Sequence, residues 1–144
     1  MFPVSMNGTV RAKPAEVLDT VLLQSVICDD LRRQQIACES DASEIRFVNR
    51  SFSVFTLTRY SVVERGSFIV KPNGIDYRLS TKVLTLVGSL LAILFGLFFV
   101  GLQNQSVADW LLVPVGTWIL LVGANYAMTW YRNYIFLRRL VTNG

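Results

Sequence analysis

Two long apolar segments in the C-terminal half decide the fold of this chain. Residues 83–102 read VLTLVGSLLAILFGLFFVGL, and residues 107–130 read VADWLLVPVGTWILLVGANYAMTW. Between Val83 and Tyr131 the only charged side chain is Asp109. A water-soluble fold cannot leave so long a segment nearly uncharged, because too little polar surface would remain to face the solvent. The segregation of charge therefore favours a membrane protein over a soluble protein with a buried helical hairpin.

Each apolar segment is long enough to cross a bilayer as a helix. About 20 helical residues span the hydrocarbon core, which is roughly 30 Å thick. Unpaired backbone groups in that core would cost several kcal/mol each, so both segments must be helical. The polar connector Gln103-Asn104-Gln105-Ser106 allows only a tight antiparallel turn. The predicted fold is a small α+β soluble domain, with one main helix on an antiparallel sheet, followed by a two-helix transmembrane hairpin.

Basic residues flank the two segments on one side of the membrane only. The connector has none, whereas the outer flanks carry Lys71, Arg78, Lys82, Arg132, Arg138 and Arg139. Because basic flanks stay inside, both termini are predicted to be cytoplasmic, in the inner membrane of a bacterial cell. The first thirty residues lack the pattern of a cleavable signal peptide, so the first span is expected to act as the targeting signal.

This orientation divides the chain into three expected parts. Residues 1–82 form a cytosolic α+β domain, residues 83–131 the transmembrane hairpin with spans of about 83–102 and 107–130, and residues 132–144 a basic cytosolic tail. Aromatic and basic side chains at the ends of spans anchor helices at the headgroups. The predicted anchors are Lys82, Trp110, Trp130, Tyr131, Arg132, Arg138 and Arg139.

Small residues at a spacing of four predict close helix packing within the spans. Gly88, Ala92 and Gly96 form one such ridge, and Gly123 with Ala127 forms a shorter one. Such ridges let helix backbones approach closely. Asn125 is the most polar side chain well inside a span, and we expect it to bond to the neighbouring span. The partner of these ridges could be the other span, a second copy or another protein.

The N-terminal domain shows one helical pattern. It begins at Pro14, which suits a first helical turn, and is expected to end near Gln34 or Gln35. The expected buried positions are 17, 18, 21, 22, 28 and 31. The charged face, including the adjacent Asp29 and Asp30, is expected to be solvated.

Strand signals surround this helix. Asn7-Gly8 and Arg65-Gly66 resemble tight turns, and Ile45 and Phe47 alternate with Arg46. Strands are predicted near 59–64, 67–71 and 75–81, the last two joined by a turn at Pro72-Asn73-Gly74. The last strand runs almost directly into the first span, so the domain is expected to sit close to the bilayer.

The residues that catalysis and metal binding most often use are scarce. The chain has no histidine, which removes the commonest general base and zinc ligand. Cys28 and Cys38 are expected to be reduced thiols in the cytosol. We therefore expect no catalytic residues, no metal, no cofactor and no enzymatic activity. Basic residues alternate with Phe and Tyr between 46 and 60, but strand alternation explains them better than nucleic-acid binding does.

Three functions remain open. The first is a non-enzymatic accessory or assembly subunit of a cytoplasmic-membrane protein complex, with a protein partner or a second copy and the lipid bilayer as its partners. The second is a membrane immunity or defence protein directed against a toxin. The third is a membrane-tethered small-ligand-binding domain, which predicts a pocket above roughly 300 Å³.

Overall fold

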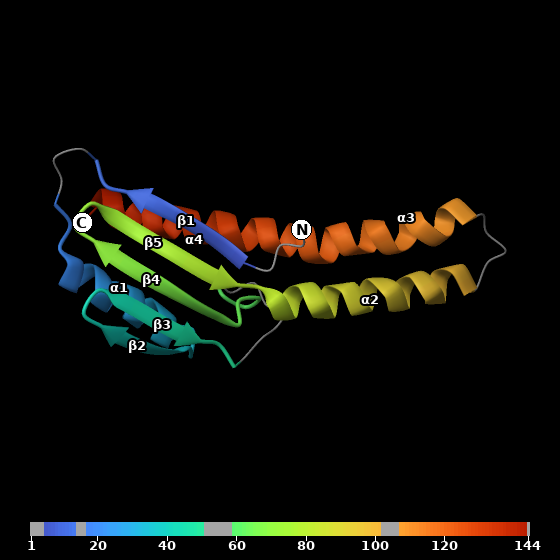
Figure 1. The fold of residues 1–144 in the computed structure, drawn as a ribbon, viewed down its shortest axis with the longest axis horizontal. Helices are drawn as coiled ribbons and strands as arrows, with labels where there is room; N and C mark the ends of the chain where they lie inside the picture. Colours follow the sequence, from blue (N-terminus) through green and yellow to red (C-terminus); the bar gives the residue numbers. More distant parts are fainter. Residues whose placement is uncertain (1–4, 14–16, 51–58, 102–106, 144) are drawn as a thin grey trace.

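The computed structural model describes residues 5–13, 17–50, 59–101 and 107–143, without the side chains of 99–101, 107–111 and 143. The N-terminal elements are β1 (Ser5–Arg11), α1 (Thr20–Arg33), β2 (Ala37–Asp41), β3 (Glu44–Val48), β4 (Arg65–Lys71) and β5 (Gly74–Ser80). The helices α2 (Lys82–Gly101), α3 (Val107–Trp118), η1 (Ile119–Gly123) and α4 (Ala124–Asn143) follow. The protein is thus an α+β fold, as predicted (Figure 1).

The five strands form one antiparallel sheet in the order β1-β5-β4-β3-β2. The predicted turn at Pro72-Asn73-Gly74 is confirmed, because it joins β4 to β5 in the register Lys71↔Gly74. Gly74 has a φ of 157°, and a side chain there would collide with the carbonyl oxygen of Val10 on β1. Glycine is therefore required at the first residue of β5.

Among the described residues, helices cover one face of the sheet and leave the other open. Successive side chains of a strand point to opposite faces, and the buried positions alternate with exposed ones along β3, β4 and β5. The covered face includes Met6, Val10, Ile45, Phe47, Phe68, Val70, Ile75, Tyr77 and Leu79. Helices α1 and α4 both pack on this face (Figure 1). The expectation of one main helix on the sheet was incomplete, because the C-terminal helix supplies the second.

Helix α1 begins later than the sequence pattern predicted. Oδ1 of Asp19 accepts hydrogen bonds from the backbone N–H groups of Val21 and Leu22, both at 3.0 Å, so Asp19 is the N-cap. The predicted start at Pro14 was wrong, because residues 17–19 are not helical; residues 14–16 lie outside the described part. The predicted end near Gln34 is confirmed.

The buried face of α1 also differs from the prediction. The helix buries Leu23, Ile27, Cys28 and Leu31, which repeat at the spacing of one helical face. Val17, Val21 and Leu22 are instead 83%, 75% and 53% exposed. The sequence pattern was misread because these three residues are apolar without contributing to the core.

Three turn and strand predictions were wrong. Asn7 and Gly8 lie inside β1, and Arg65 and Gly66 open β4. Glycine is needed at position 8 because a Cβ atom there would lie only 2.5 Å from the hydroxyl oxygen of Tyr77. Residues 59–64 form turns, with the backbone N–H of Val63 bonded to the carbonyl of Tyr60 at 3.1 Å. Strand β2 was missed, because most of its side chains are exposed and leave no apolar pattern.

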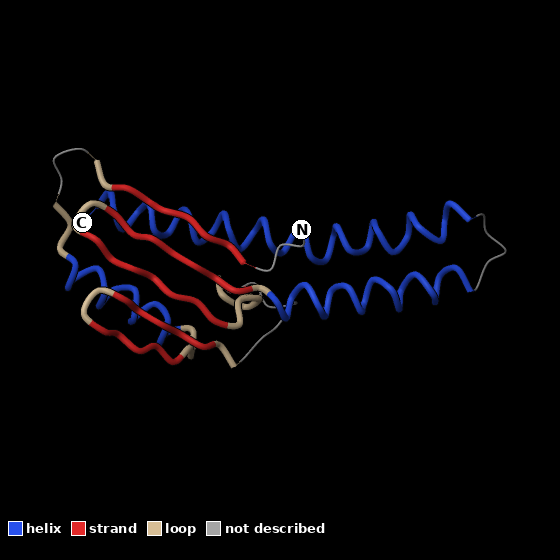
Figure 2. Tube along the Cα trace, in the orientation of Figure 1, coloured by secondary structure: helices blue, strands red, loops and turns tan. Residues whose placement is uncertain are grey.

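Two long helical segments project from one end of the sheet (Figure 2). Helix α2 begins two residues after β5 ends, which confirms the direct passage from strand to helix. Helix α3 runs back beside α2 and continues through a π-helical turn, η1, into α4. We call α2 together with α3 and η1 the helix pair. Among residues with described side chains, Leu112–Thr142 is the one helix both long and apolar enough to cross a bilayer, and Lys82–Phe98 is apolar but shorter.

Candidate functional site

The two helices of the helix pair touch along the ridge of small residues on α2. Gly88 and Ala92 are buried, and a side chain at Gly88 would collide with Cγ2 of Val122 in η1. Further along, a side chain at Gly96 would collide with the ring of Pro114 in α3. The missing side chains therefore make the space that Val122 and Pro114 fill, which is how small residues let helices approach.

The second ridge of small residues lies elsewhere. The nearest atom outside the backbone to a side chain at Gly123 belongs to Ile119 of its own helix, at 3.9 Å. Ala127 is exposed. Gly123 and Ala127 are therefore not part of the contact with α2, and their surface is open for lipid or another chain.

Three polar side chains in or next to the helix pair, Ser89, Trp118 and Asn125, are paired locally. Nε1 of Trp118 donates a hydrogen bond to Oγ of Ser89 across the two helices at 2.9 Å, and Ser89 donates to the carbonyl of Thr85 at 2.7 Å. Nδ2 of Asn125 donates to the carbonyl of Leu121 at 2.7 Å. The predicted bond of Asn125 to the neighbouring helix is thus replaced by a bond within its own helix, next to the π-helical turn.

The outward surface of the helix pair is apolar on both helices. Large exposed hydrophobic side chains on α2 include Leu86, Leu90, Ile93, Leu94, Phe95, Leu97 and Phe98. On the facing segment they include Leu112, Val115, Ile119 and Leu120. Soluble monomers rarely expose apolar patches of this extent. Exposed apolar surfaces of this extent are typical of membrane or protein interaction sites.

The residues expected to anchor the spans lie at the ends of the helix pair or on α4. Lys82 is the exposed first residue of α2. Trp130 and Tyr131 are exposed on α4, and the Trp130 ring stacks on Tyr134 with centroids 5.8 Å apart. Arg138 and Arg139 are exposed and Arg132 is half-buried. Trp110 belongs to α3, and its side chain is outside the described part.

The segment predicted to be a basic tail packs on the sheet. Asn133 and Leu137 have no exposed surface, and Val141 is almost fully buried in the core that α1 and the sheet share. The hydroxyl of Tyr126 donates to the carbonyl of Ser5 on β1 at 3.3 Å. Residues 132–143 thus join the helix pair to the sheet.

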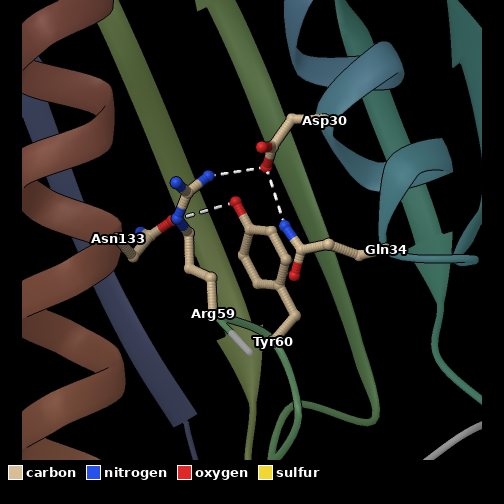
Figure 3. Close-up of polar contacts among 5 residues, drawn as sticks. All are labelled: Asp30, Gln34, Arg59, Tyr60 and Asn133. Atoms are coloured by element: carbon tan, nitrogen blue, oxygen red, sulfur yellow. Dashed lines mark hydrogen bonds and ion pairs between the residues drawn. The ribbon is translucent and has the colours of Figure 1, made fainter. Parts of the chain in front are cut away.

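A polar cluster connects α1 to α4 beneath the sheet (Figure 3). We call Asp30, Gln34, Arg59, Tyr60 and Asn133 the Arg59 cluster. Nη1 of Arg59 lies 2.6 Å from Oδ2 of Asp30, and both side chains are 23% exposed. Nε2 of Gln34 donates to the same carboxylate at 3.0 Å. The prediction that Asp29 and Asp30 are both solvated was wrong for Asp30.

The C-terminal helix contributes two further contacts to this cluster. The hydroxyl of Tyr60 donates to Oδ1 of Asn133 at 3.3 Å, and the Arg59 guanidinium lies 3.7 Å from the centroid of the Phe136 ring. Such a cation–π contact stabilises a partly buried guanidinium. Nδ2 of Asn133 and Oε1 of Gln34 are buried without a hydrogen-bond partner in the described part of the chain.

The charges of the Arg59 cluster suit a structural link rather than proton transfer. Burial raises the pKa of Asp30, while Arg59 and Gln34 oppose the shift. Burial also raises the pKa of Tyr60 far above its usual range, so the phenol stays protonated. The phenol serves as a hydrogen-bond donor, and the carboxylate is engaged by the guanidinium. The cluster therefore fixes α1, the turn before β4 and α4 relative to one another.

An open groove of about 580 Å³ lies on the uncovered face of the sheet. It is lined by Ser5, Glu44, Arg46, Phe47, Val48, Glu64, Arg65, Gly66, Ser67, Arg78, Ser80 and Lys82. We call it the basic groove. The sequence did not reveal it, because its lining residues come from β1, β3, β4, β5 and the start of α2 and meet only in the folded sheet.

Within the described residues, no group of three or more His, Cys, Asp or Glu side chains is placed to hold a metal ion. Cys28 and Cys38 are free thiols on α1 and β2. Comparison of the chain with protein-family models, curated proteins and solved structures found no match.

Proposed function

We propose that this chain is a non-enzymatic accessory subunit of a protein complex in the cytoplasmic membrane. The helix pair would cross the bilayer twice, with both termini and the sheet on the cytoplasmic side. The sheet and its two helices would then present a rigid platform to a protein partner at the membrane surface.

The apolar outward surface of the helix pair carries this proposal. Its exposed apolar side chains lie on α2 and on the segment formed by α3 and η1. Transfer of each such side chain out of water is favourable by roughly 1.5–3 kcal/mol. Insertion of the pair into a bilayer would therefore be strongly favourable. Trp118 and Ser89 inside the pair, and Asn125 just beyond η1, make hydrogen bonds, which suits a hydrocarbon environment.

The orientation is supported by the basic residues at the sheet end of the helix pair. Arg78 and Lys82 lie near the start of α2, and Arg132, Arg138 and Arg139 lie on α4. The positive-inside rule assigns this end to the cytoplasm.

A second apolar patch outside the helix pair supports a protein partner. Val17, Val21 and Leu22 are exposed at the start of α1, on the sheet-bearing part of the molecule rather than on the helix pair. They precede the charged remainder of the helix surface, Asp29, Arg32 and Arg33. Adjacent exposed apolar side chains of this kind are found at protein interaction sites.

Sidedness can be tested with engineered cysteines. In a Cys28→Ser, Cys38→Ser background, Gln105→Cys is expected to react with a membrane-impermeant thiol reagent on intact cells. Asn143→Cys is expected to react only after the cells are opened. The reverse pattern, or labelling of both positions on intact cells, would contradict the proposed orientation.

Partner binding can be tested by purification from native membranes in a mild detergent. The wild-type chain is expected to elute with one protein in a fixed ratio, and the two purified proteins are expected to reassemble. Val17→Ser with Val21→Ser should weaken the reassembly at least about tenfold, since each valine that an interface buries contributes roughly 1.5 kcal/mol or more. Val48→Ser with Ile69→Ser, which removes exposed valine and isoleucine from the sheet, is the matched control. A bare wild-type monomer would contradict the proposal.

A further inference from the structure

The basic groove lies at the end of the sheet from which the helix pair projects. Ser80 ends β5, and Lys82 begins α2 two residues later; both line the groove. If the helix pair crosses the bilayer, as we have proposed, the groove opens at the depth of the lipid headgroups. The position of the groove is therefore fixed by the chain connection between β5 and α2.

The sheet register explains why a hollow forms there. Ser67 on β4 pairs with Arg46 on one side and with Arg78 on the other. In the neighbouring row, Ser80 on β5 pairs with Arg65 and with Ser5. The short side chain of Ser67 thus lies between two long arginine side chains, and Ser80 and Ser5 lie beside Arg65 in the next row. Because adjacent strands are roughly 4.8 Å apart, Arg46 and Arg78 stand about 10 Å from each other.

The lining of the groove is positively charged. Its charged side chains are four basic ones, Arg46, Arg65, Arg78 and Lys82, and two acidic ones, Glu44 and Glu64. The groove therefore has a net charge of +2, half the charge of the whole chain. The opposite end of the same face carries Arg11 and Lys71, where Asp76 lies beside Lys71.

The two acidic side chains are already engaged. Oε1 of Glu64 accepts a hydrogen bond from Ser80 at 2.8 Å, and Oε2 accepts one from the backbone N–H of Val83 at 3.0 Å. Glu64 therefore caps the start of α2, and its distance to Nε of Arg65 is 3.6 Å. Glu44 pairs with Arg46 at 2.6 Å. Within the described residues, Arg78 and Lys82 have no ion-pair partner, so they can take an external anion.

We propose that the basic groove binds the phosphate headgroup of an anionic phospholipid. Guanidinium groups bind phosphate oxygens in a bidentate manner. Arg78 has no ion-pair partner within the described residues, and the exposed Arg65, whose Nε lies 3.6 Å from Glu64, stands on the neighbouring strand. Lys82 marks the level at which the apolar helix begins, so the acyl chains of the bound lipid can lie along α2. A lipid bound at this site would fix the tilt of the sheet relative to the membrane. This inference rests on the proposed insertion of the helix pair.

The test uses the full-length protein in a neutral detergent. Phosphatidylglycerol and phosphatidylcholine with identical acyl chains are titrated separately, and bound lipid is counted by native mass spectrometry. The wild type is expected to bind phosphatidylglycerol at least about tenfold more tightly than phosphatidylcholine. Arg65→Gln with Arg78→Gln is expected to abolish this preference. Both side chains are exposed, so these changes leave the core intact.

Arg11→Gln with Lys71→Gln is the matched control, because it removes two basic charges from the far end of the same face. This variant is expected to keep the preference. Equal binding of the two lipids by the wild type, or equal losses in both variants, would overturn the proposal. If inorganic phosphate at the same concentration as the lipid displaces phosphatidylglycerol from the protein, the groove binds a soluble anion instead. Failure of membrane insertion is read separately, from the cysteine labelling described above.

Discussion

The hydroxyl of Tyr60 donates a hydrogen bond to Oδ1 of Asn133 at 3.3 Å, across 73 positions of sequence. Tyr60 lies in the turn before β4, and Asn133 lies on α4. Both side chains are fully buried. This bond, together with the contact of Arg59 on Phe136, ties the C-terminal helix to the sheet. Any movement of the helix pair relative to the sheet therefore strains a buried polar contact.

Removal of the Tyr60 hydroxyl should destabilise the protein. Tyr60→Phe leaves both polar atoms of the buried Asn133 amide without a partner, and we expect a loss of about 1–3 kcal/mol in unfolding free energy. Tyr60→Phe combined with Asn133→Leu replaces both partners by apolar groups and should recover part of that loss. The free energies are measured by chemical unfolding in mild detergent. If the loss of unfolding free energy in the double variant equals the sum of the losses in the two single variants, the two side chains are not coupled.

A substitution at Gly88 should force the helix pair apart. A valine there would overlap Val122, and overpacking of this kind costs about 1–3 kcal/mol. Gly116→Val is the matched control, because a side chain at Gly116 meets nothing within 4 Å. Thermal unfolding in detergent should show a lower midpoint for Gly88→Val only. Equal midpoints for the two variants would show that the ridge is not a packing surface.

Asp76 should stabilise the sheet at neutral pH and not at acidic pH. Hydrogen bonds from Lys71 and then Thr9 lower the pKa of this carboxyl. The stabilisation is therefore present above the ordinary pKa of about 3.9 and is lost as the pH falls through the lower pKa of the folded state. Asp76→Asn should cost about 0.5–1 kcal/mol at pH 7, and the cost should shrink as the carboxyl of the wild type becomes protonated in acid. A difference between wild type and variant that persists unchanged in acid would contradict this assignment.

The two cysteines should differ in reactivity. Burial raises the pKa of the Cys28 thiol to about 11, and the neighbouring Cys38 adds to the shift. At pH 8 iodoacetamide is expected to modify the half-exposed Cys38 first, since only the thiolate reacts. Cys38→Ser should leave Cys28 unmodified until denaturant is added, when Cys28 reacts fully. Fast labelling of Cys28 in the folded Cys38→Ser variant would be the opposite result.

The sequence predicted the α+β class, the β4–β5 turn and the end of α1, because each depends on local signals. Pro72-Asn73-Gly74 interrupts two alternating runs, and Gln34 follows the last helical positions. The sequence-based prediction of burial was wrong for Val17, Val21 and Leu22, because apolar residues at helical spacing were taken as core residues. It also failed for residues 59–64, because a turn buried in the core has the composition of a strand.

Charge segregation along the chain by itself placed two long apolar helical segments in residues 83–102 and 107–130, although the second helix runs on to Asn143. Only the tertiary structure decided what the last helix does. Leu137 and Val141 are buried because α4 returns to the sheet, and no local pattern encodes that return. The basic groove was likewise decided by strand order, because Arg46, Arg65 and Arg78 become neighbours only when antiparallel pairing brings three strands together.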